Sequence, residues 1–389
     1  MPIKCAFFLP ERVIFGNGVA QQVGECVKDL KGEKVFLVTD KGVTGLDSFK
    51  DVEKSLEKEA VDYYLYAEVD ANPTDTQVER GAKLYKEEKA DVLVALGGGS
   101  SIDSAKAIGI SVNNGGAIQD YAGVDLVENR IPPLIAIPTT AGTGSEVSIW
   151  AVITNTKGNY KIAPGGWKVL PKVALVDPMM TVGMPPLLTA ATGMDALSHA
   201  VEAYCTPYAM PQTDAMAMAA IRLIVKHLGP ALVNGSNLEA REGMAMGSLE
   251  AGMAFSNAGC GGIHALGHQL STQCGMPHGM AMAIMMPPVM KFNMIACIDQ
   301  LADIAVAMGE QVEGLSEREA AEKAPLAVRQ LLRSVGLPTT LSEYGVDQKL
   351  IPNLAKWALK DGDLPGNPRG LALEQIEELY RKAFEENLD

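Results

Sequence analysis

Residues 91–112 read DVLVALGGGSSIDSAKAIGISV, and this stretch decides the fold. The run Val92–Leu96 is apolar, as a buried strand would be, and it leads directly into Gly97, Gly98 and Gly99. A helical pattern begins straight after these glycines. Glycines let a backbone approach an anion closely, and a helix N-terminus offers N–H groups and partial positive charge. The order strand, glycine turn, helix therefore indicates a pyrophosphate-binding turn.

The same stretch has a plainer interpretation, a tight strand-to-helix turn in which Ser100 or Ser101 caps the helix. The glycines do not follow the GxGxxG fingerprint, so this turn alone is a moderate signal. A second polar turn, PTTAGTGSE at 138–146, follows the apolar run Leu134–Ile137. Ligands of open α/β sheets bind at the carboxyl ends of the strands, so two such turns favour a bound dinucleotide.

Apolar runs alternate with amphipathic segments, such as 77–89, through the first half of the chain. The expected strands are Val35–Val38, Val61–Tyr66, Val92–Leu96, Leu134–Ile137 and Val173–Val176. Strands separated by helices predict parallel βαβ units. The opening FFLPERVIFG, residues 7–16, is expected to form a small hairpin or a pair of edge strands.

The pattern changes near Asp177, where Pro185 and Pro186 can end one element and begin a helix. Beyond them alanine, methionine and leucine dominate at helical spacing. We therefore predict an α/β chain. Residues 1–184 form a Rossmann-like, parallel-sheet dinucleotide domain, and 185–389 form an all-helical domain that holds the metal and the substrate.

Composition excludes several classes of partner. The 389 residues are 47 % hydrophobic and 21 % charged, with a formal net charge of −14, which argues against nucleic acid and anionic membranes as main partners. The N-terminus lacks the apolar core of a signal peptide, and no stretch reaches the ~18 uncharged apolar residues of a membrane span. The six cysteines are scattered, as in a reduced cytoplasmic protein.

Four of the five histidines form a pattern with one aspartate. Asp195 and His199 are four residues apart on one helix face, as are His264 and His268, and His278 follows. Each pair alone could be a surface hydrogen bond or chance. Together, in a chain so poor in histidine, they favour a metal site. The fifth histidine lacks such a partner and is expected to be structural.

Imidazole and carboxylate ligands suit Zn²⁺, Fe²⁺, Co²⁺ or Mn²⁺, and this pattern contains no thiolate that would favour a softer metal. A bound metal with an open position lowers the pKa of an oxygen ligand such as water. Hydride transfer from an alcohol needs the same chemistry, because the alcohol oxygen must lose its proton.

These motifs resemble the iron-containing (group III) alcohol dehydrogenases almost from end to end, and most closely their 1,3-propanediol, methanol/butanol and lactaldehyde-reductase branch. The motifs, in the family's order, are GGGSSIDSAKAI, PTTAGTGSEV, TAATGMDALSHAVEAY, GMAFSNA, HALGHQL, PHGMA and NPRG.

The resemblance implies that Asp195, His199, His264 and His278 bind the metal, with Fe²⁺ expected first. It places His268 beside the metal without ligating it, where it relays the alcohol proton or positions the nicotinamide. The expected cofactor contacts are Asn72, Gly97, Gly98, Gly99, Ser100, Ser101, Asp103, Thr139, Thr140, Thr143 and Lys161. It also implies a homo-oligomer.

Asp40 ends the strand Val35–Thr39, and a carboxylate there can bind the adenosine ribose and repel a 2′-phosphate. It therefore predicts NAD rather than NADP, although Lys41 could offset part of that repulsion. The plainer interpretation is that Asp40 caps the turn DKGVTG.

The expected substrate is a small primary alcohol or its aldehyde, in a pocket set by Trp150, Phe255 and Leu364, with Asp363 as a further candidate. Relatives in this branch commonly have Leu-Gly-Tyr where Cys260–Gly262 stands here, and Gly-Gly where Ser271 and Thr272 stand. These departures leave the identity of the alcohol open.

Three alternatives remain open. A glycerol dehydrogenase or a dehydroquinate-synthase-like lyase would share the two domains, but the lyase needs a Lys and Arg cluster that is not seen around 264–278. A non-catalytic metal-binding protein would not need the two polar turns. A non-haem iron oxygenase would need only two histidines and one carboxylate, and no dinucleotide turn.

Overall fold

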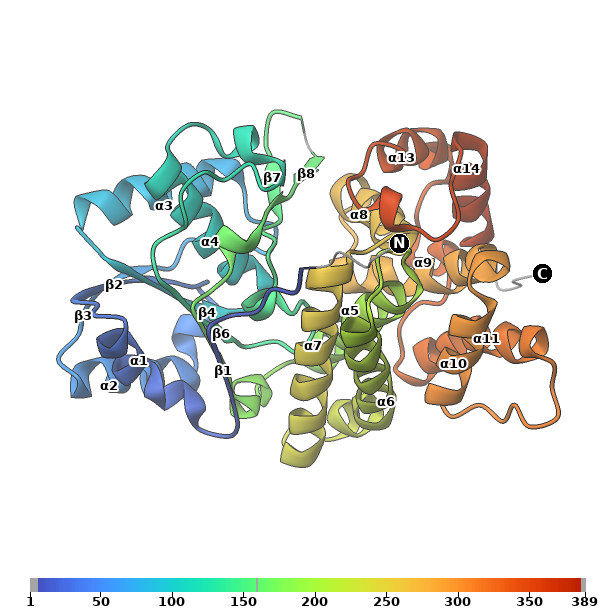
Figure 1. Cartoon of the computed structure of the whole chain (residues 1–389), viewed down its shortest axis with the longest axis horizontal. Helices are drawn as coiled ribbons and strands as arrows, with labels where there is room; N and C mark the ends of the chain where they lie inside the picture. Colours follow the sequence, from blue (N-terminus) through green and yellow to red (C-terminus); the bar gives the residue numbers. More distant parts are fainter. Residues whose placement is uncertain (1–5, 159, 386–389) are drawn as a thin grey trace. The chain divides into compact units, whose positions relative to one another are not determined.

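Six parallel strands form the sheet of the first unit, in the order β1-β10-β6-β4-β2-β3 (Figure 1). Their bounds are β1 Arg12–Phe15, β2 Lys34–Val38, β3 Asp62–Tyr66, β4 Val92–Gly97, β6 Leu134–Pro138 and β10 Val173–Val176. Five of them match the apolar runs of the sequence, which confirms the parallel βαβ organisation. The structure, a computed structural model, describes residues 6–158 and 160–385.

Both faces of this sheet are buried, as its continuously apolar strands require. Phe36 and Val38 belong to one core cluster, whereas Val35 and Leu37 belong to the other. Four helices supply the facing side chains: α1 (Val23–Asp29) and α2 (Asp47–Lys58) on one face, and α3 (Asp75–Glu87) and α4 (Gly99–Asn114) on the other. Two short pairs, β5 (Gly123–Val124) with β9 (Pro164–Gly165) and β7 (Ile153–Asn155) with β8 (Tyr160–Ile162), complete the unit.

The expectation of a hairpin or edge-strand pair at residues 7–16 was wrong. The segment contributes one edge strand, β1, which pairs in parallel with β10 far along the chain, with Arg12 opposite Val173. This pairing packs Ile14 against the buried core cluster. A local hairpin signal could not reveal a strand whose partner is so distant in sequence.

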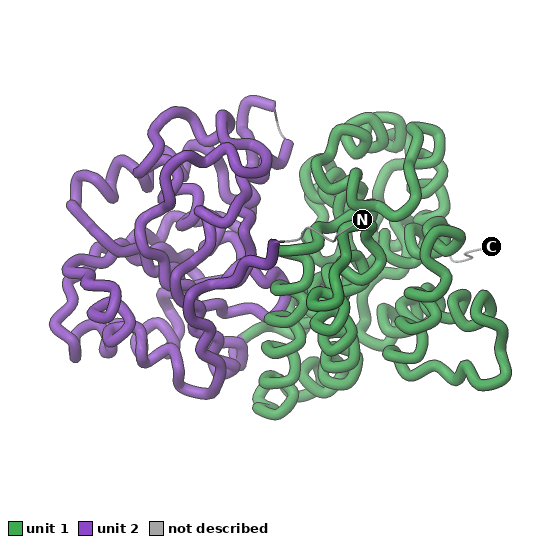
Figure 2. Tube along the Cα trace, in the orientation of Figure 1, with its two compact units in different colours: residues 1–5, 184–389 green, residues 6–183 purple. Residues whose placement is uncertain are grey.

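The other compact unit, from Met184 onward, is helical. Figure 2 draws this helical unit in green as unit 1, and the sheet-bearing first unit of the chain in purple as unit 2. Its helices are α5 Pro186–Cys205, α6 Pro211–Val233, α7 Leu238–Ala258, α8 Gly262–Cys274, α9 His278–Asn293, α10 Ile298–Ala307, α11 Glu317–Ser334, α12 Leu341–Tyr344, α13 Ile351–Ala358 and α14 Leu373–Lys382. Pro185 and Pro186 begin α5, as their fixed φ favours. The predicted fold class, a parallel-sheet domain followed by a helical one, is confirmed.

Two helical segments, Pro211–Val233 and His278–Ala296, are long and apolar enough to cross a membrane by length and composition alone. In the second segment 78 % of the most apolar window is buried inside the structure. Core helices of folded proteins have the same character, so these segments are weak evidence for a membrane.

Candidate cofactor turns and metal centre

The sheet of the first unit has a topological switch point between β2 and β4. From β2 the chain crosses to β3 on one side, whereas from β4 it proceeds to β6 and β10 on the other. Asp40 follows β2, and the glycine turn follows β4. Open α/β sheets bind ligands outside the carboxyl ends of the strands at such points.

The glycine turn places a helix N-terminus at that edge. Helix α4 begins at Gly99 with Gly98 as its N-cap, so Ser100 and Ser101 lie in the first turn and neither caps the helix. Gly97 has a φ of 155°, which favours glycine. No acidic residue occupies the first turn of α4, so its partial positive charge is available to an anion.

The two polar turns are in direct contact. The backbone N–H of Thr139 donates to the Gly97 carbonyl at 3.0 Å. A Cβ added at Gly99 would lie 2.7–2.9 Å from the side chain of Thr143, which is too close for any larger residue. The structure thus brings both predicted turns together at one edge of the sheet.

Lys161 and Asn72 also meet, although they are far apart in the sequence. Lys161 lies on β8, and its Nζ donates to Asn72 Oδ1 at 2.8 Å. Burial lowers the pKa of Lys161 to about 8. The hydroxyl of Ser100 donates to the Ala71 carbonyl at 2.8 Å, which ties the Asn72 loop to the start of α4.

Asp103 is engaged by the protein through both oxygens. One accepts from the Ser145 hydroxyl, and the other accepts from the Val152 N–H at 3.0 Å. The carboxylate therefore holds the threonine turn against α4. Sequence reasoning missed its neighbour Lys106, which is fully buried and donates to the Trp150 carbonyl at 2.6 Å. Burial lowers the pKa of Lys106 to about 8.

The two oxygens of Asp40 have different surroundings. Oδ1 accepts from the backbone N–H groups of Gly42 and Val43 at 2.8 and 3.1 Å, so it does cap the turn. Oδ2 lies 3.5 Å from where a Cβ of Gly97 would be, so it faces the glycine turn. The turn interpretation of Asp40 is therefore confirmed, and the ribose contact stays a prediction.

In the helical unit, three helices bring the predicted metal ligands together. Asp195 and His199 lie on α5, His264 lies on α8, and His278 begins α9. One ligand atom from each of Asp195, His264 and His278 lies within 4.8 Å of the others. The rings of His199 and His264 stack with centroids 4.5 Å apart.

Two buried atoms of this cluster can bind a divalent cation. Asp195 Oδ1 and His264 Nε2 have no hydrogen-bond partner within the described residues, and Asp195 Oδ1 lies 3.4 Å from His278 Nε2, a second ligand candidate. Burial raises the pKa of Asp195 to about 7 and lowers that of His264 to about 3. The pocket penalises charge on either residue alone, and a bound cation would supply the charge that stabilises the carboxylate.

Glu202, one turn after His199 on α5, is a functional residue that sequence reasoning missed. Its Oε2 accepts from His264 Nδ1, and its Oε1 accepts from the Ile263 N–H at 2.6 Å and the His264 N–H at 3.3 Å. Burial raises the pKa of Glu202 to about 8. The carboxylate fixes the His264 ring so that Nε2 is the atom left to bind a metal.

The ligand pattern also omitted Cys260. One donor atom from each of His199, Cys260 and His264 lies within 4.8 Å of the others, so a thiol stands beside the imidazoles. Burial raises the pKa of the Cys260 thiol well above its ordinary value. The five cysteines of the described chain are free, and Cys5 lies outside the described residues.

His268 faces a different pair of groups. Its Nδ1 lies 3.1 Å from Asp361 Oδ2 and 3.7 Å from Asp363 Oδ2. Its ring stacks on that of His278, with centroids 5.4 Å apart. Sequence reasoning named Asp363 but not Asp361, which lies only two residues earlier.

The four predicted substrate-pocket residues fall in two places. Phe255 stacks on the His199 ring at 4.1 Å, and Leu364 begins the 3-10 turn η9 (Leu364–Gly366) directly after Asp363. These three residues belong to the helical unit and adjoin the histidine cluster. Trp150 belongs to the first unit, where its ring packs against Gly165.

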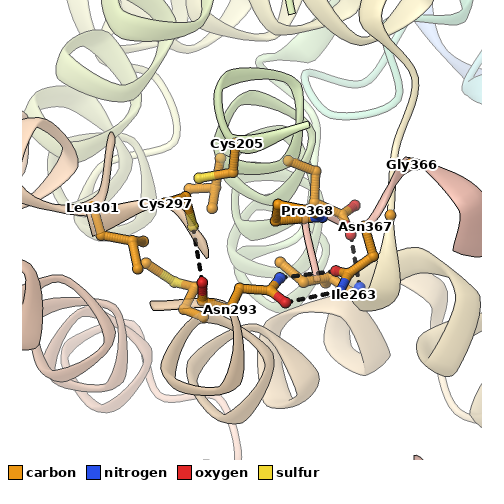
Figure 3. Close-up of a pocket in the computed structure, with 12 residues that line it drawn as sticks. Cys205, Ile263, Asn293, Cys297, Leu301, Gly366, Asn367 and Pro368 are labelled. Carbon is orange, nitrogen blue, oxygen red and sulfur yellow. Dashed lines mark hydrogen bonds between the residues drawn. The ribbon is translucent and has the colours of Figure 1, made fainter. Parts of the chain in front are cut away.

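A small cavity in the helical unit is lined by Asn293 and Asn367, whose side chains are hydrogen-bonded to each other (Figure 3). Their side-chain amides exchange hydrogen bonds of 2.8 and 2.7 Å, and Asn367 Oδ1 also accepts from the Gly262 N–H. Asn367 of the NPRG motif therefore anchors the start of α8, the helix that carries His264 and His268. Glu202 also lines this cavity.

These features define the class as a metal-dependent oxidoreductase of the nucleotide-binding α/β type. Two family models match the chain: iron-containing alcohol dehydrogenase over residues 10–178, and the C-terminal model of the Fe-containing alcohol dehydrogenase family over 189–384.

Individual relatives agree over nearly the full chain. The 1,3-propanediol dehydrogenase of Citrobacter freundii is 45 % identical over 97 % of this chain and 98 % of its own length. The NAD-dependent methanol dehydrogenase of Bacillus methanolicus is 41 % identical over 97 % and 99 %. A crystal structure of 1,3-propanediol oxidoreductase superposes with a TM-score of 0.96 at 43 % identity, covering 98 % of this chain and all of its own. The chain belongs to the iron-containing alcohol dehydrogenase family.

Proposed function

We propose that this oxidoreductase oxidises small primary alcohols to aldehydes with NAD and a divalent metal, foremost Fe²⁺, and catalyses the reverse reduction. The observation that carries the proposal is the clustering of Asp195, His199, His264 and His278, in which Asp195 Oδ1 and His264 Nε2 are buried without a hydrogen-bond partner among the described residues. Two of the relatives are named as dehydrogenases of small alcohols, which supports the same reaction.

Different residues of the helical unit are proposed to bind the metal and to accept the alcohol proton. Asp195, His199, His264 and His278 would hold the metal, which supplies a Lewis acid for the alcohol oxygen. His268 would accept the hydroxyl proton, and a bound nicotinamide would supply the acceptor for the hydride of the carbinol carbon. The products would be the aldehyde, the reduced cofactor and a proton on His268.

The cofactor proposal rests on the first unit. The N-terminus of α4 offers its partial positive charge to the pyrophosphate, and Lys161, held by Asn72, adds a cation. Asp40 Oδ2, beside Gly97, would accept the ribose hydroxyls and repel a 2′-phosphate, which favours NAD over NADP.

Phe255, Asp363 and Leu364 are proposed to line the substrate end, and Trp150 is proposed to limit the size of the alcohol. The residues around the cluster are acidic or apolar: Glu202, Asp361 and Asp363 lie nearest to its histidines. These acidic side chains cannot supply the cations that a phosphate-bearing substrate needs, which disfavours the lyase alternative. Cytoplasmic location and a homo-oligomeric state are further parts of the proposal.

The test is a panel of alcohols from ethanol to hexanol, with 1,3-propanediol and glycerol, offered with NAD to protein loaded separately with Fe²⁺, Zn²⁺, Mn²⁺ or Co²⁺. Formation of reduced nicotinamide is followed by its near-ultraviolet absorbance. We expect turnover on primary alcohols and the corresponding aldehydes. Turnover on glycerol alone would favour the glycerol dehydrogenase alternative, and none with any metal would refute the proposal.

A further inference from the structure

Asp361 lies in the segment between α13 and η9, and donors surround its carboxylate. Oδ2 lies 3.1 Å from His268 Nδ1 and accepts from Gln269 Nε2 at 3.1 Å. Oδ1 accepts from the Asp363 backbone N–H at 3.1 Å. Both oxygens are therefore fixed, and one of them is aimed at the His268 ring.

We infer that Asp361 is a positioning residue that fixes the tautomer and the orientation of His268. This inference rests on the proposed function, in which His268 accepts the alcohol proton. A carboxylate at Nδ1 can only accept, so Nδ1 carries the hydrogen and Nε2 keeps a lone pair. The same division of roles between a carboxylate and a histidine serves proton transfer in catalytic triads.

The neighbouring carboxylate does not take this role. Asp363 Oδ2 lies 3.7 Å from His268 Nδ1, beyond hydrogen-bond distance. Burial and the nearby Asp361 raise the pKa of Asp363 to about 7. Asp361 is thus the partner of His268, and Asp363 is the matched control.

A second cation is the competing use of this cluster, because donor atoms of His268, Asp361 and Asp363 lie within 4.8 Å of one another. The hydrogen bonds argue against it. Gln269 and the Asp363 backbone direct N–H groups at the Asp361 oxygens, and a cation would have to displace these donors.

The Asp361→Asn variant separates positioning from packing. The Asp363 backbone N–H next to the old Oδ1 cannot reverse, whereas Gln269 can turn its side-chain amide and accept instead of donate. The new amide therefore places its oxygen towards Asp363 and its NH₂ towards His268. Nδ1 must then accept, and the hydrogen moves to Nε2, where it blocks proton uptake. Asp361→Ala leaves Nδ1 to water without forcing this tautomer, so the isosteric asparagine is expected to be the more harmful change.

The tautomer can be read without any turnover. Protein labelled with ¹⁵N-histidine and loaded with diamagnetic Zn²⁺ is studied by NMR, with His268→Ala to assign the ring. We expect Nδ1–H in the parent and in Asp363→Asn, and Nε2–H in Asp361→Asn. The inference would be overturned if His268 carried its hydrogen on Nε2 in the parent, or if Asp361→Asn left the tautomer unchanged. Either result would count whether or not any alcohol is oxidised.

Kinetics and metal content complete the test. In Asp361→Asn kcat should fall roughly 10²–10⁴-fold, the usual contribution of general acid–base catalysis, while the KM for NAD stays within about twofold. Asp361→Ala should lose less, and the exposed Asp299→Asn should behave as the parent. The positioning role would be refuted if kcat fell as far in Asp361→Ala as in Asp361→Asn. It would also be refuted if the parent bound two metal ions per chain and Asp361→Asn bound only one. Failure of the parent on every alcohol would refute the proposed function alone, since the tautomer is measured separately.

Discussion

The Glu202→Gln variant tests how the fold prepares His264 to bind a metal. The Ile263 N–H at 2.6 Å and the His264 N–H at 3.3 Å both point at Oε1. The glutamine oxygen must stay on that side, so its NH₂ group would face His264 Nδ1. The ring must then accept at Nδ1 and carry its hydrogen on Nε2, the atom left for the metal.

The expected loss is about 10–100-fold in metal affinity, or roughly 1.4–2.7 kcal/mol, as for other carboxylate partners of ligating histidines. The fold should survive without metal. The amide has the same shape as the carboxyl, and its oxygen can still accept from the Ile263 and His264 N–H groups, so the substitution should cost little stability.

The assay is competition for Zn²⁺ or Co²⁺ against a chromophoric chelator, with thermal unfolding of the metal-free proteins measured alongside. The exposed Glu322→Gln on α11 serves as the matched control and should bind as the parent does. Parent affinity in Glu202→Gln would show that Glu202 does not prepare the ligand. A large fall in metal-free stability would show that its role is structural.

Three further predictions concern the first unit. The parent should favour NAD over NADP by at least about tenfold in kcat/KM, which is ~1.4 kcal/mol. Asp40→Gly should reduce this preference by raising kcat/KM with NADP. An unchanged ratio would show that Asp40 does not select the cofactor. Gly99→Ala should weaken NAD binding at least about tenfold, because the new Cβ would lie 2.7–2.9 Å from the Thr143 side chain. The control Gly45→Ala, whose Cβ would have nothing within 4 Å, should bind NAD as the parent does. Equal Kd values for NAD in the two variants would contradict this prediction. Burial lowers the pKa of Lys161 to about 8, so the amine is cationic below that pH. Above it the Kd for NAD should rise by up to roughly tenfold per pH unit, and Lys161→Gln should flatten this pH profile. A flat profile in the parent would exclude Lys161 as a cation that binds NAD.

The strands and the two polar turns were predictable because their signals are local. An apolar run followed by glycine or threonine specifies a strand end, and parallel pairing then brings β4 and β6 together with Gly97 opposite Pro138. The partner of β1 was not predictable, since its pairing with Val173–Val176 depends on the completed sheet.

In the helical unit, i,i+4 spacing was enough to suggest Asp195 with His199 as one pair of metal ligands. It could not supply Glu202 or Asp361, because carboxylates are common and their roles depend on how helices and loops cross. Glu202 carried a usable signal, since it lies three residues after His199 on the same face. Cys260 was overlooked because a single thiol has no spacing to read.

The metal proposed for the helical unit should be required for turnover but not for binding the dinucleotide. The most direct measurement compares chelated protein, verified as metal-free, with the same sample after reloading, for both alcohol oxidation and NAD titration. Without metal we expect no turnover but saturable NAD binding, and turnover should recover on reloading. Full activity in the metal-free protein would contradict it.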